Sequence, residues 1–253
     1  MKPLPKIYSR SERPTLTIIP NPAHLEILRG FSTSEFERIQ KHCSHQVFKP
    51  GEALFQEGKP LQNVFFILKG HVKFCKKETK DREVTFSLFS EGDIFELMMS
   101  DQPEIHLFSA YALSETVALK VSPPDFRKLF MGNEGFANRI LYQKIRTIKR
   151  FFFSRLAAGE PVNVRMACLI LDIVQRPGMA HSEGKSICLD IPLTRRDIAE
   201  IVNTSVETSI RVIRKWIKRG LVTVAQRHLV IQDISAFKRI VAKIPRLPDY
   251  KNQ

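Results

Sequence analysis

The chain has 253 residues and a formal net charge of +14, which indicates a polyanionic partner such as nucleic acid or an anionic membrane face. This length is enough for two domains, and no apolar run approaches the roughly 20 residues that span a bilayer. The N-terminus lacks a signal-peptide pattern, and the four cysteines are scattered without a C-x-x-C pair. We therefore expect a cytoplasmic protein with reduced thiols rather than a disulfide framework or a zinc ribbon.

The N-terminal half of the chain contains three segments with different residue patterns. Prolines among basic and polar residues predict a flexible, mostly unstructured arm over residues 1–22. A short helix is expected from Glu35 to about His42, with Ser34 as its N-cap. From Val47 to Val121, short apolar stretches are separated by glycine and proline turns such as KPGE, EGKP and EGD. Repeated strands with turns at this spacing predict a compact antiparallel barrel or sandwich.

In the next segment, FANRILYQKIRTIKRFFFSRL, the apolar residues have the spacing of an α-helix. The apolar residues at alternating steps of four and three are Leu141, Ile145, Ile148 and Phe152. This is the spacing of a coiled-coil seam, and basic residues without an acidic one flank it from Arg139 to Arg155. A helix that buries the stripe in its own monomer is the alternative, but so long a helix between two domains favours a dimer seam.

Several residues that end or begin helices lie between the long helix and the C-terminal part of the chain. AAGEPV ends the long helix, and Pro161 is well placed to open the next one at VNVRMACLILDIVQ. A loop with Pro177, Gly178 and Gly184 is expected to follow, and then a short strand around SICLDI. A last short helix is expected over residues 235–243.

The segment LTRRDIAEIVNTSVETSIRVIRKW, residues 193–216, has the pattern of two short helices joined by a tight turn. Thr194 with Asp197 three residues later is a capping-box pattern that starts the first helix. Asn203 suits the left-handed conformation of a sharp turn, and Ser205 is placed to cap the second helix. Gly220 ends that helix, and LVTVAQRHLVI after it is expected to form a two-stranded wing. Helix, turn, helix and hairpin in this order predict a winged helix-turn-helix.

The second helix of this motif has two distinct sides. The residues predicted to pack on the first helix are Val206, Ile210, Ile213 and Ile217. Glu207 and Arg211 are one turn apart on the exposed side, near the end of the helix that enters the major groove. An arginine there can bind guanine O6 and N7, and a glutamate can accept from cytosine N4, each pair discriminating by about 1–3 kcal/mol. A plain Glu–Arg ion pair on a solvated face is the alternative, worth about 0.2–0.5 kcal/mol.

The predicted DNA contacts fall into two groups. The expected base-reading residues are Val206, Glu207, Thr208, Ile210 and Arg211. Helix N-termini, hydroxyls and basic side chains are expected to contact phosphates, and these residues are Thr194, Arg195, Ser205, Arg214, Lys215 and Arg227. Each basic residue among them is about equally well explained as ordinary surface.

These features together resemble the CRP/FNR family of bacterial transcription regulators, from about residue 25 to the end of the chain. The resemblance is carried by KPGEALFQEGKPLQNVFFILKGHVKF, FSEGDIF, the long helix and LTRRDIAEIVNTSVETSIRVIRKWIKRGLV. It implies an α+β fold with a jelly-roll-like antiparallel β-roll, a long dimerisation helix and a winged helix-turn-helix. The corresponding parts are the arm over 1–22, the β-roll sensor domain over 23–134, the dimerisation helix over 135–158 and the DNA-binding domain over 159–253.

The resemblance also implies a homodimer on an inverted-repeat DNA site. Glu207 and Arg211 match the pair that reads a TGA-like core in the catabolite-activator and FNR branches. Val206 stands where the catabolite activator has a further base-reading arginine and the FNR branch an apolar residue, so FNR-type half-sites are favoured. Ile210 replaces a serine of that branch, which leaves the outer base preference open. An effector would rotate the two winged domains about a hinge near residues 157–161.

The sensor part departs from the ligand patterns of the family. The Gly-Glu pair of cAMP-binding members is replaced by Phe95 and Glu96, and their Arg-Ser pair aligns with His106 and Leu107, so a bound phosphate would lack its arginine. Glu96 and Met98 stand where haem-bound members have a cysteine and a histidine. An iron–sulfur cluster would need clustered N-terminal cysteines, which this sequence lacks. Cyclic AMP, haem and an iron–sulfur cluster are therefore all disfavoured, and the cofactor is unknown.

An effector in the β-roll would still have an expected place. The candidate pocket residues are Phe95, Glu96, Leu97, Met98, His106 and Leu107. The sequence HCSH is a separate cluster, with His42, Cys43 and His45. A metal or redox site is one interpretation, but a polar helix-to-strand connection is favoured, because these ligands lack a fourth member for a tetrahedral site. No metal-binding residues are therefore predicted.

We interpret the chain as a sequence-specific DNA-binding transcription regulator. The expected partners are double-stranded DNA, a second copy of the chain and RNA polymerase, and no membrane. A regulatory module whose winged domain docks a protein is the alternative, which salt-dependent DNA binding would distinguish. An enzyme is not expected, because the sequence has no nucleophile–base grouping, phosphate-cradling glycine loop or complete metal motif.

Overall fold

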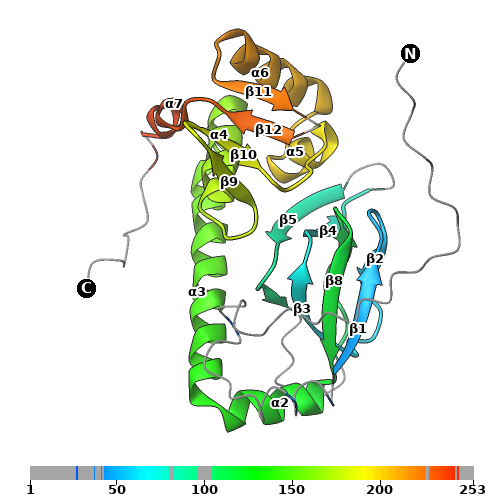
Figure 1. The fold of residues 1–253 in the computed structure, drawn as a ribbon. Helices are drawn as coiled ribbons and strands as arrows, with labels where there is room; N and C mark the ends of the chain where they lie inside the picture. The colour runs from blue at the N-terminus through cyan, green and yellow to red at the C-terminus, as the bar shows by residue number, and fades with distance from the viewer. Residues whose placement is uncertain are drawn as a thin grey trace, which may run out of the picture.

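The computed structural model describes residues 27, 37, 41, 43–79, 83–95, 104–225, 228–242 and 244. The predicted arm over residues 1–22 lies outside these residues, and of the helix predicted over 35–42 only Glu37 and Lys41 are described, both helical. A β-roll and a C-terminal group of helices and short strands lie along one long helix, α3(Glu134–Ala157) (Figure 1). The predicted α+β class is confirmed. Among the described residues, no helix has the length and hydropathy needed to cross a membrane.

The β-roll consists of two four-stranded antiparallel sheets. The first has the order β1(Cys43–Phe48), β8(Thr116–Val121), β3(Val64–Lys69) and β6(Ile94–Phe95). The second has the order β2(Ala53–Phe55), β7(Ser109–Ala112), β4(Val72–Lys77) and β5(Glu83–Phe89). The turn from β3 to β4 requires glycine, because Gly70 has a φ of 95° and a side chain there would collide with the backbone of Glu115.

The central strands β3 and β8 of the first sheet are buried on both faces, because they lie between two apolar clusters. On β3, Phe65 and Ile67 point into the roll, while Phe66 packs toward α2(Pro123–Gly132) and α3. Alternation divides β8 in the same way, with Ala118 inside the roll and Leu119 on the helix side. Burial on both faces explains why the sequences of β3 and β8 are almost continuously apolar. Their outer side chains pack against the start of α3.

The C-terminal part surrounds a single apolar cluster. Its helices are α4(Val162–Val174), α5(Arg195–Ile201), α6(Val206–Lys218) and α7(Ile234–Ile240). Its sheet has the order β11(Val222–Ala225), β12(His228–Ile231), β10(Ser186–Leu189) and β9(Ala180–Glu183). The predicted two-stranded wing thus belongs to a four-stranded sheet, and residues 180–183, predicted as loop, form β9. The sequence AHSE carries no strand signal of its own, and it pairs with β10 across a turn at Gly184, whose φ is 61°.

A buried ionic contact joins the roll to α5. The Lys73 ammonium on β4 lies 3.0 Å from Asp197 Oδ1 and 3.0 Å from Glu200 Oε2. The three side chains are only 9–13% exposed. Burial alone would lower the pKa of Lys73, but the charges and hydrogen bonds of Asp197 and Glu200 outweigh it and raise the pKa above its usual value. The ammonium therefore stays charged across the physiological pH range.

A second contact between these parts involves the end of α4. The Arg176 guanidinium lies 3.3 Å from Asp93 Oδ2 in the turn between β5 and β6. Two residues later, the Gly178 carbonyl accepts a hydrogen bond of 2.8 Å from His71 Nε2. The loop that leads from α4 into β9 is therefore fixed to two turns of the roll.

Lys73→Met keeps most of the side-chain volume but removes the cation that Asp197 and Glu200 share, and Glu200 keeps its ion pair of 2.9 Å with the exposed Arg196. We expect the free energy of unfolding to fall by about 3 kcal/mol, because removing one partner leaves buried charges uncompensated. Urea denaturation followed by circular dichroism measures this loss. Lys76→Met, on the same strand, removes an exposed ion pair of 2.9 Å with Glu57 and should cost less than about 1 kcal/mol. Equal losses in the two variants would contradict a special contribution of the Lys73 contact.

Candidate DNA interface

The first helix of the predicted motif, α5, begins at a complete capping box. The Thr194 hydroxyl accepts a hydrogen bond of 3.1 Å from the Asp197 N–H, and the Asp197 carboxylate accepts one of 2.9 Å from the Thr194 N–H. The predicted capping box is confirmed. Burial alone would raise the pKa of Asp197, but hydrogen bonds from Thr194 and the charge of Lys73 lower the pKa below its usual value. One ionised carboxylate thus fixes both the start of α5 and its contact with the roll.

The turn between α5 and α6 contains a residue in the left-handed region. Asn203 has a φ of 52°, a conformation that asparagine tolerates better than most residues. Helix α6 begins directly after Ser205, whose hydroxyl accepts a hydrogen bond of 3.2 Å from the Thr208 N–H. The predicted turn residue and the predicted N-cap are both confirmed.

The buried face of α6 differs from the predicted one. The residues that face the core are Ser209, Ile213 and Trp216, each at most 3% exposed. Of the four residues predicted for this face, only Ile213 is fully buried, while Val206 and Ile210 are half-buried and Ile217 is 42% exposed. The physical reason is that a small residue, Ser209, contacts α5 directly. The Ser209 hydroxyl lies 3.1 Å from the Arg195 carbonyl and 2.8 Å from the Val206 carbonyl, so it is buried with its donor satisfied.

The exposed side of α6 presents Glu207 and Arg211 one turn apart. Within the described part of the chain they form no ion pair with each other, and the Arg211 guanidinium lies 3.5 Å from the Thr208 hydroxyl instead. Hydrogen bonds from its own backbone N–H and from the Ser205 hydroxyl lower the pKa of Glu207. The start of α6 therefore offers an ionised acceptor, followed one turn later by a planar guanidinium donor.

The predicted phosphate-contacting residues surround this pair. Those at the starts of the two helices are Thr194 and Ser205, both exposed, and Arg195, which is half-buried. Burial lowers the pKa of Arg195. Arg214 and Lys215 are exposed farther along α6, and Arg227 lies outside the described residues. The described members of the set thus lie at the N-terminus of α5 and along α6.

The described residues of the predicted effector pocket are Phe95, His106 and Leu107, and they lie in different surroundings. Phe95 is fully buried among phenylalanines that fill the roll, with ring centroids 4.8 Å from Phe74 and 5.0 Å from Phe89. His106 is buried and stacked on Phe55 at 3.9 Å, and burial lowers its pKa. Leu107 is 65% exposed, and Glu96, Leu97 and Met98 lie outside the described residues. The described pocket candidates are therefore partly core and partly surface, because the aromatic side chains occupy the interior.

A cavity lies outside the roll instead, between α3, the β5–β6 turn and residues 176–178. Its volume is about 570 Å³, within the range of small-molecule sites. Its basic lining residues are Arg139, Arg146, Arg150 and Arg176, and its acidic ones are Glu91 and Asp93. Burial and the neighbouring guanidinium of Arg176 lower the pKa of Arg150. Carboxylates balance part of this positive charge, since Asp172 lies 3.2 Å from Arg150 and Asp93 lies 3.3 Å from Arg176. The sequence signal for the cavity was the basic run from Arg139 to Arg155.

The HCSH sequence does not form a metal centre among the described residues. Cys43 begins β1 and packs against the apolar cluster under α2, where burial, and secondarily the charge of Asp125, raise its pKa to about 12. A thiol held in the protonated form is a poor metal ligand. His45 is exposed on the same strand, and His42 lies outside the described residues. Cys43 therefore packs against the apolar cluster between the first sheet and the helices α2 and α3.

Comparison with known protein families identifies both halves of the chain. Residues 45–133 match the model of the cyclic nucleotide-binding domain, and residues 164–240 match that of the Crp-like helix-turn-helix domain. A CRP-like cAMP-activated global transcriptional regulator of Mycobacterium tuberculosis is 23% identical over 220 residues, which cover 86% of this chain and 96% of that protein. The cAMP-activated global transcriptional regulator CRP of Salmonella typhimurium is 24% identical over 199 residues, covering 77% of this chain and 92% of that protein.

Solved structures share the fold. FixK2 from Bradyrhizobium japonicum superposes with a TM-score of 0.67 at 18% identity, over 78% of this chain and 96% of that one. The c-di-GMP-responsive global regulator CLP of Xanthomonas campestris superposes with a TM-score of 0.64 at 20% identity, over 80% of this chain and 100% of that one. The two family models occur in the same order along one chain, and the relatives match over most of their length. The chain therefore belongs to the CRP/FNR family of transcription regulators.

Proposed function

We propose that the protein acts as a homodimer that binds an inverted-repeat DNA site with TGA-like half-sites and regulates transcription from it. The observation that carries this proposal is the exposed Glu207–Arg211 pair at the start of α6, in a helix-turn-helix whose caps and turn are complete. The curated relatives are transcriptional regulators by name, which supports the same role here. RNA polymerase is the expected protein partner, and chromosomal DNA as a target implies a cytoplasmic location.

Base reading is supported by the chemistry of the two side chains. The Glu207 carboxylate is an acceptor only, which fits the cytosine N4 amino group, and the Arg211 guanidinium fits the O6 and N7 atoms of guanine. Because the two do not bind each other, both have free hydrogen-bonding capacity on the exposed side. The half-buried Val206 and Ile210 at the edges of this surface can offer apolar contacts to thymine methyl groups.

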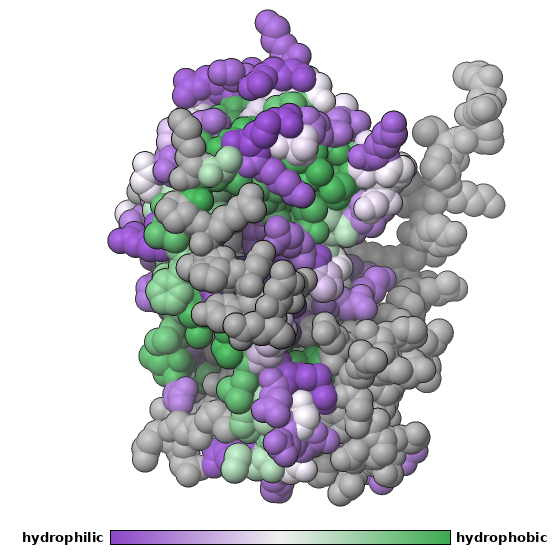
Figure 2. Space-filling view, turned by 90° about the vertical axis from the view of Figure 1, so that its left-hand side faces the viewer, coloured by the Kyte–Doolittle hydropathy of each residue, from purple (hydrophilic) through white to green (hydrophobic). Residues whose placement is uncertain are grey.

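Dimerisation is supported by the exposed face of α3. Leu141, Ile145, Ile148 and Phe152 are 50–55% exposed. Figure 2, which faces the side of the molecule on which α3 lies, shows apolar surface in green among polar surface in purple. A second copy of this helix would cover the stripe by coiled-coil packing and would relate two reading helices by a two-fold axis. The half-sites would then lie about one DNA turn apart.

Selection of bound sequences from a random DNA pool, with purified full-length protein and no added ligand, tests the proposal. Recovery of an inverted repeat with TGA-like half-sites would support it and would mean that the unliganded dimer is competent. If nothing is enriched, the selection is repeated with cell extract, which supplies an effector. Absence of an enriched sequence in both selections would overturn the proposal in favour of protein docking by the winged part.

Arg211→Ala should weaken binding to the selected site by about 1–3 kcal/mol and relax the preference at a single base pair. The affinities of the variant for the selected site and for sites mutated at each position measure this. Lys215→Ala is the matched control, because an exposed phosphate-contacting lysine should weaken binding to all sequences alike and reduce the salt slope by about 1. If Arg211→Ala weakened all sequences equally, its base-reading role would be refuted.

Ile148→Glu should dissociate the dimer. Burial of an isoleucine side chain contributes about 1.5–3 kcal/mol, and a two-fold interface loses it twice, so the dissociation constant should rise at least about 100-fold. Analytical ultracentrifugation over a concentration series measures this constant. Ser154→Glu is the control, since it adds the same charge at an exposed position of α3 outside the stripe. An unchanged dimer in Ile148→Glu would show that the stripe is not the seam.

A further inference from the structure

The β9–β10 hairpin gathers polar donors on one face. In the register of the two strands, Cys188 lies directly opposite His181. Asp190 follows Cys188 by two residues, so it points to the same side as both of them. The opposite side carries Ile187 and Leu189, which pack on the core of the C-terminal part. The backbone, and not a chance choice of rotamers, therefore brings a thiol, an imidazole and a carboxylate together.

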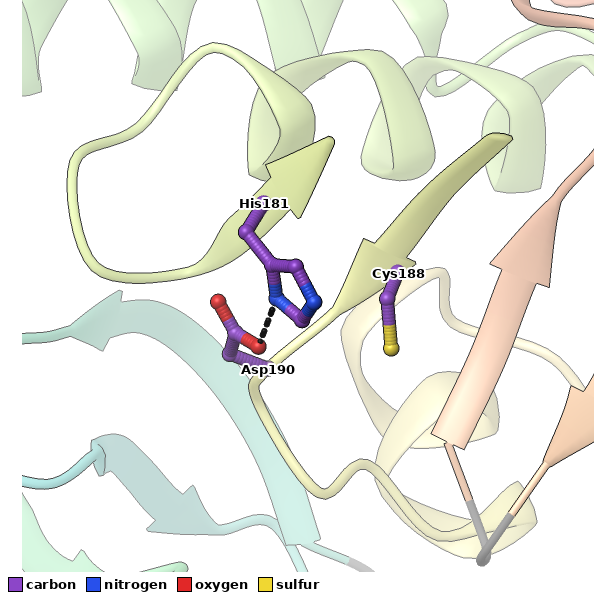
Figure 3. A group of neighbouring side chains, drawn as sticks. All are labelled: His181, Cys188 and Asp190. Carbon is purple, nitrogen blue, oxygen red and sulfur yellow. Dashed lines mark hydrogen bonds and ion pairs between the residues drawn. The ribbon is translucent and has the colours of Figure 1, made fainter. Parts of the chain in front are cut away.

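The side chains of these residues converge. One ligand atom from each of His181, Cys188 and Asp190 lies within 4.8 Å of the other two. Figure 3 shows the His181 ring between the Asp190 carboxylate and the Cys188 sulfur. The His181 Nδ1 atom lies 2.6 Å from Asp190 Oδ1, a distance at which the ring N–H donates to the carboxylate. In the neutral ring this bond leaves Nε2 with a lone pair, as in the carboxylate–histidine pairs that support metal ligands.

A second imidazole belongs to the same face. Val230 of β12 pairs with Cys188, and the Ser186 and Gln232 side chains are bonded at 2.9 Å, so the register places His228 beside Asp190. The His228 Nδ1 atom donates a hydrogen bond of 2.8 Å to the Leu189 carbonyl, which also leaves its Nε2 with a lone pair. A plain surface ion pair is the alternative explanation for His181 and Asp190. It does not account for the thiol of Cys188 and the oriented imidazole of His228 on the same face.

We propose that this face binds a divalent transition metal of the zinc type, with Cys188 Sγ, His181 Nε2 and His228 Nε2 as donors and Asp190 as a positioning residue. One sulfur and two imidazole nitrogens are the donors that zinc prefers, and three protein donors leave a fourth position for water or another ligand. Metal–donor bonds of about 2.0–2.3 Å separate donor atoms by about 3.5 Å, so Cys188 and His181 need only small rotations, whereas His228, which is not among the converging ligand atoms, has to turn farther toward them. His181 is 56% exposed, which gives an ion access.

The location gives such a site a consequence for the whole chain. The hairpin continues directly from the loop whose Gly178 carbonyl accepts the hydrogen bond from His71 of the roll. The Asp190 N–H donates to the Met179 carbonyl at 2.8 Å, so the ends of the hairpin are already joined. A metal on His181 and Cys188 would tie its two strands together and stiffen the segment that connects α4 to the roll.

Titration of untagged, chelator-treated protein with Co²⁺ tests the proposal, because thiolate coordination gives a charge-transfer absorption band and Zn²⁺ should displace it. Cys188→Ser should abolish the band. His181→Ala changes only an exposed side chain, and it should weaken Co²⁺ binding more than about 100-fold, since even outer partners of ligands contribute about 10–100-fold. Asp190→Asn should weaken binding by about 10–100-fold while the band persists. His228→Ala should also weaken binding and keep the band.

Cys43→Ser is the matched control, because this half-buried thiol also lies near histidines in the sequence. It should leave the band and the affinity unchanged. Loss of the band in Cys43→Ser but not in Cys188→Ser would assign any metal to the other cluster and overturn the proposal. Absence of a thiolate band in the unmodified protein would overturn it as well, leaving His181 and Asp190 as a surface ion pair. As a second readout, Zn²⁺ should raise the Tm of the unmodified protein and not that of His181→Ala.

Discussion

The ammonium group of Lys73 forms ion pairs with two carboxylates of α5 in a nearly water-free contact, and the position of the reading helix relative to the roll follows from it. Helix α5 packs on α6 through Ser209, so whatever holds α5 also determines where Glu207 and Arg211 point. In a low-dielectric contact the charges must be paired, and any rotation of the winged part has to break this pairing or carry it along. The ion pairs of Lys73 therefore stabilise one particular orientation of the winged part relative to the β-roll.

Features that depend on neighbouring residues in the sequence were predictable. The capping box of Thr194 and Asp197, the left-handed Asn203 and the N-cap Ser205 each involve groups within a few residues, and the structure has all of them. The long helix was predictable for the same reason, since its apolar spacing is local. Strand β9 was not, because AHSE becomes a strand only through its partner β10.

Features that depend on packing between distant segments were predicted less well. Hydropathy placed Ile217 on the buried face of α6, but the fold buries Ser209, whose hydroxyl reaches a carbonyl of α5. Short motifs suggested an effector pocket that includes Phe95 and His106, yet six buried phenylalanines, one from each of the strands β1 to β6, fill the interior of the roll around Phe95. The donors of the β9–β10 face are likewise separated in sequence by a spacing that matches no familiar metal motif. They come together only through strand register, which the sequence alone does not specify.

Asp197 has two partners, and this places an unusual restriction on its position. Its carboxylate caps α5 and also faces Lys73, so neither the helix start nor the contact between the two halves can be adjusted alone at this residue. Asparagine would keep the cap acceptor and lose the charge, whereas glutamate would keep the charge and displace the cap. Evolution of the interdomain contact in this lineage is therefore easier through Lys73 or Glu200, which have no part in starting the helix.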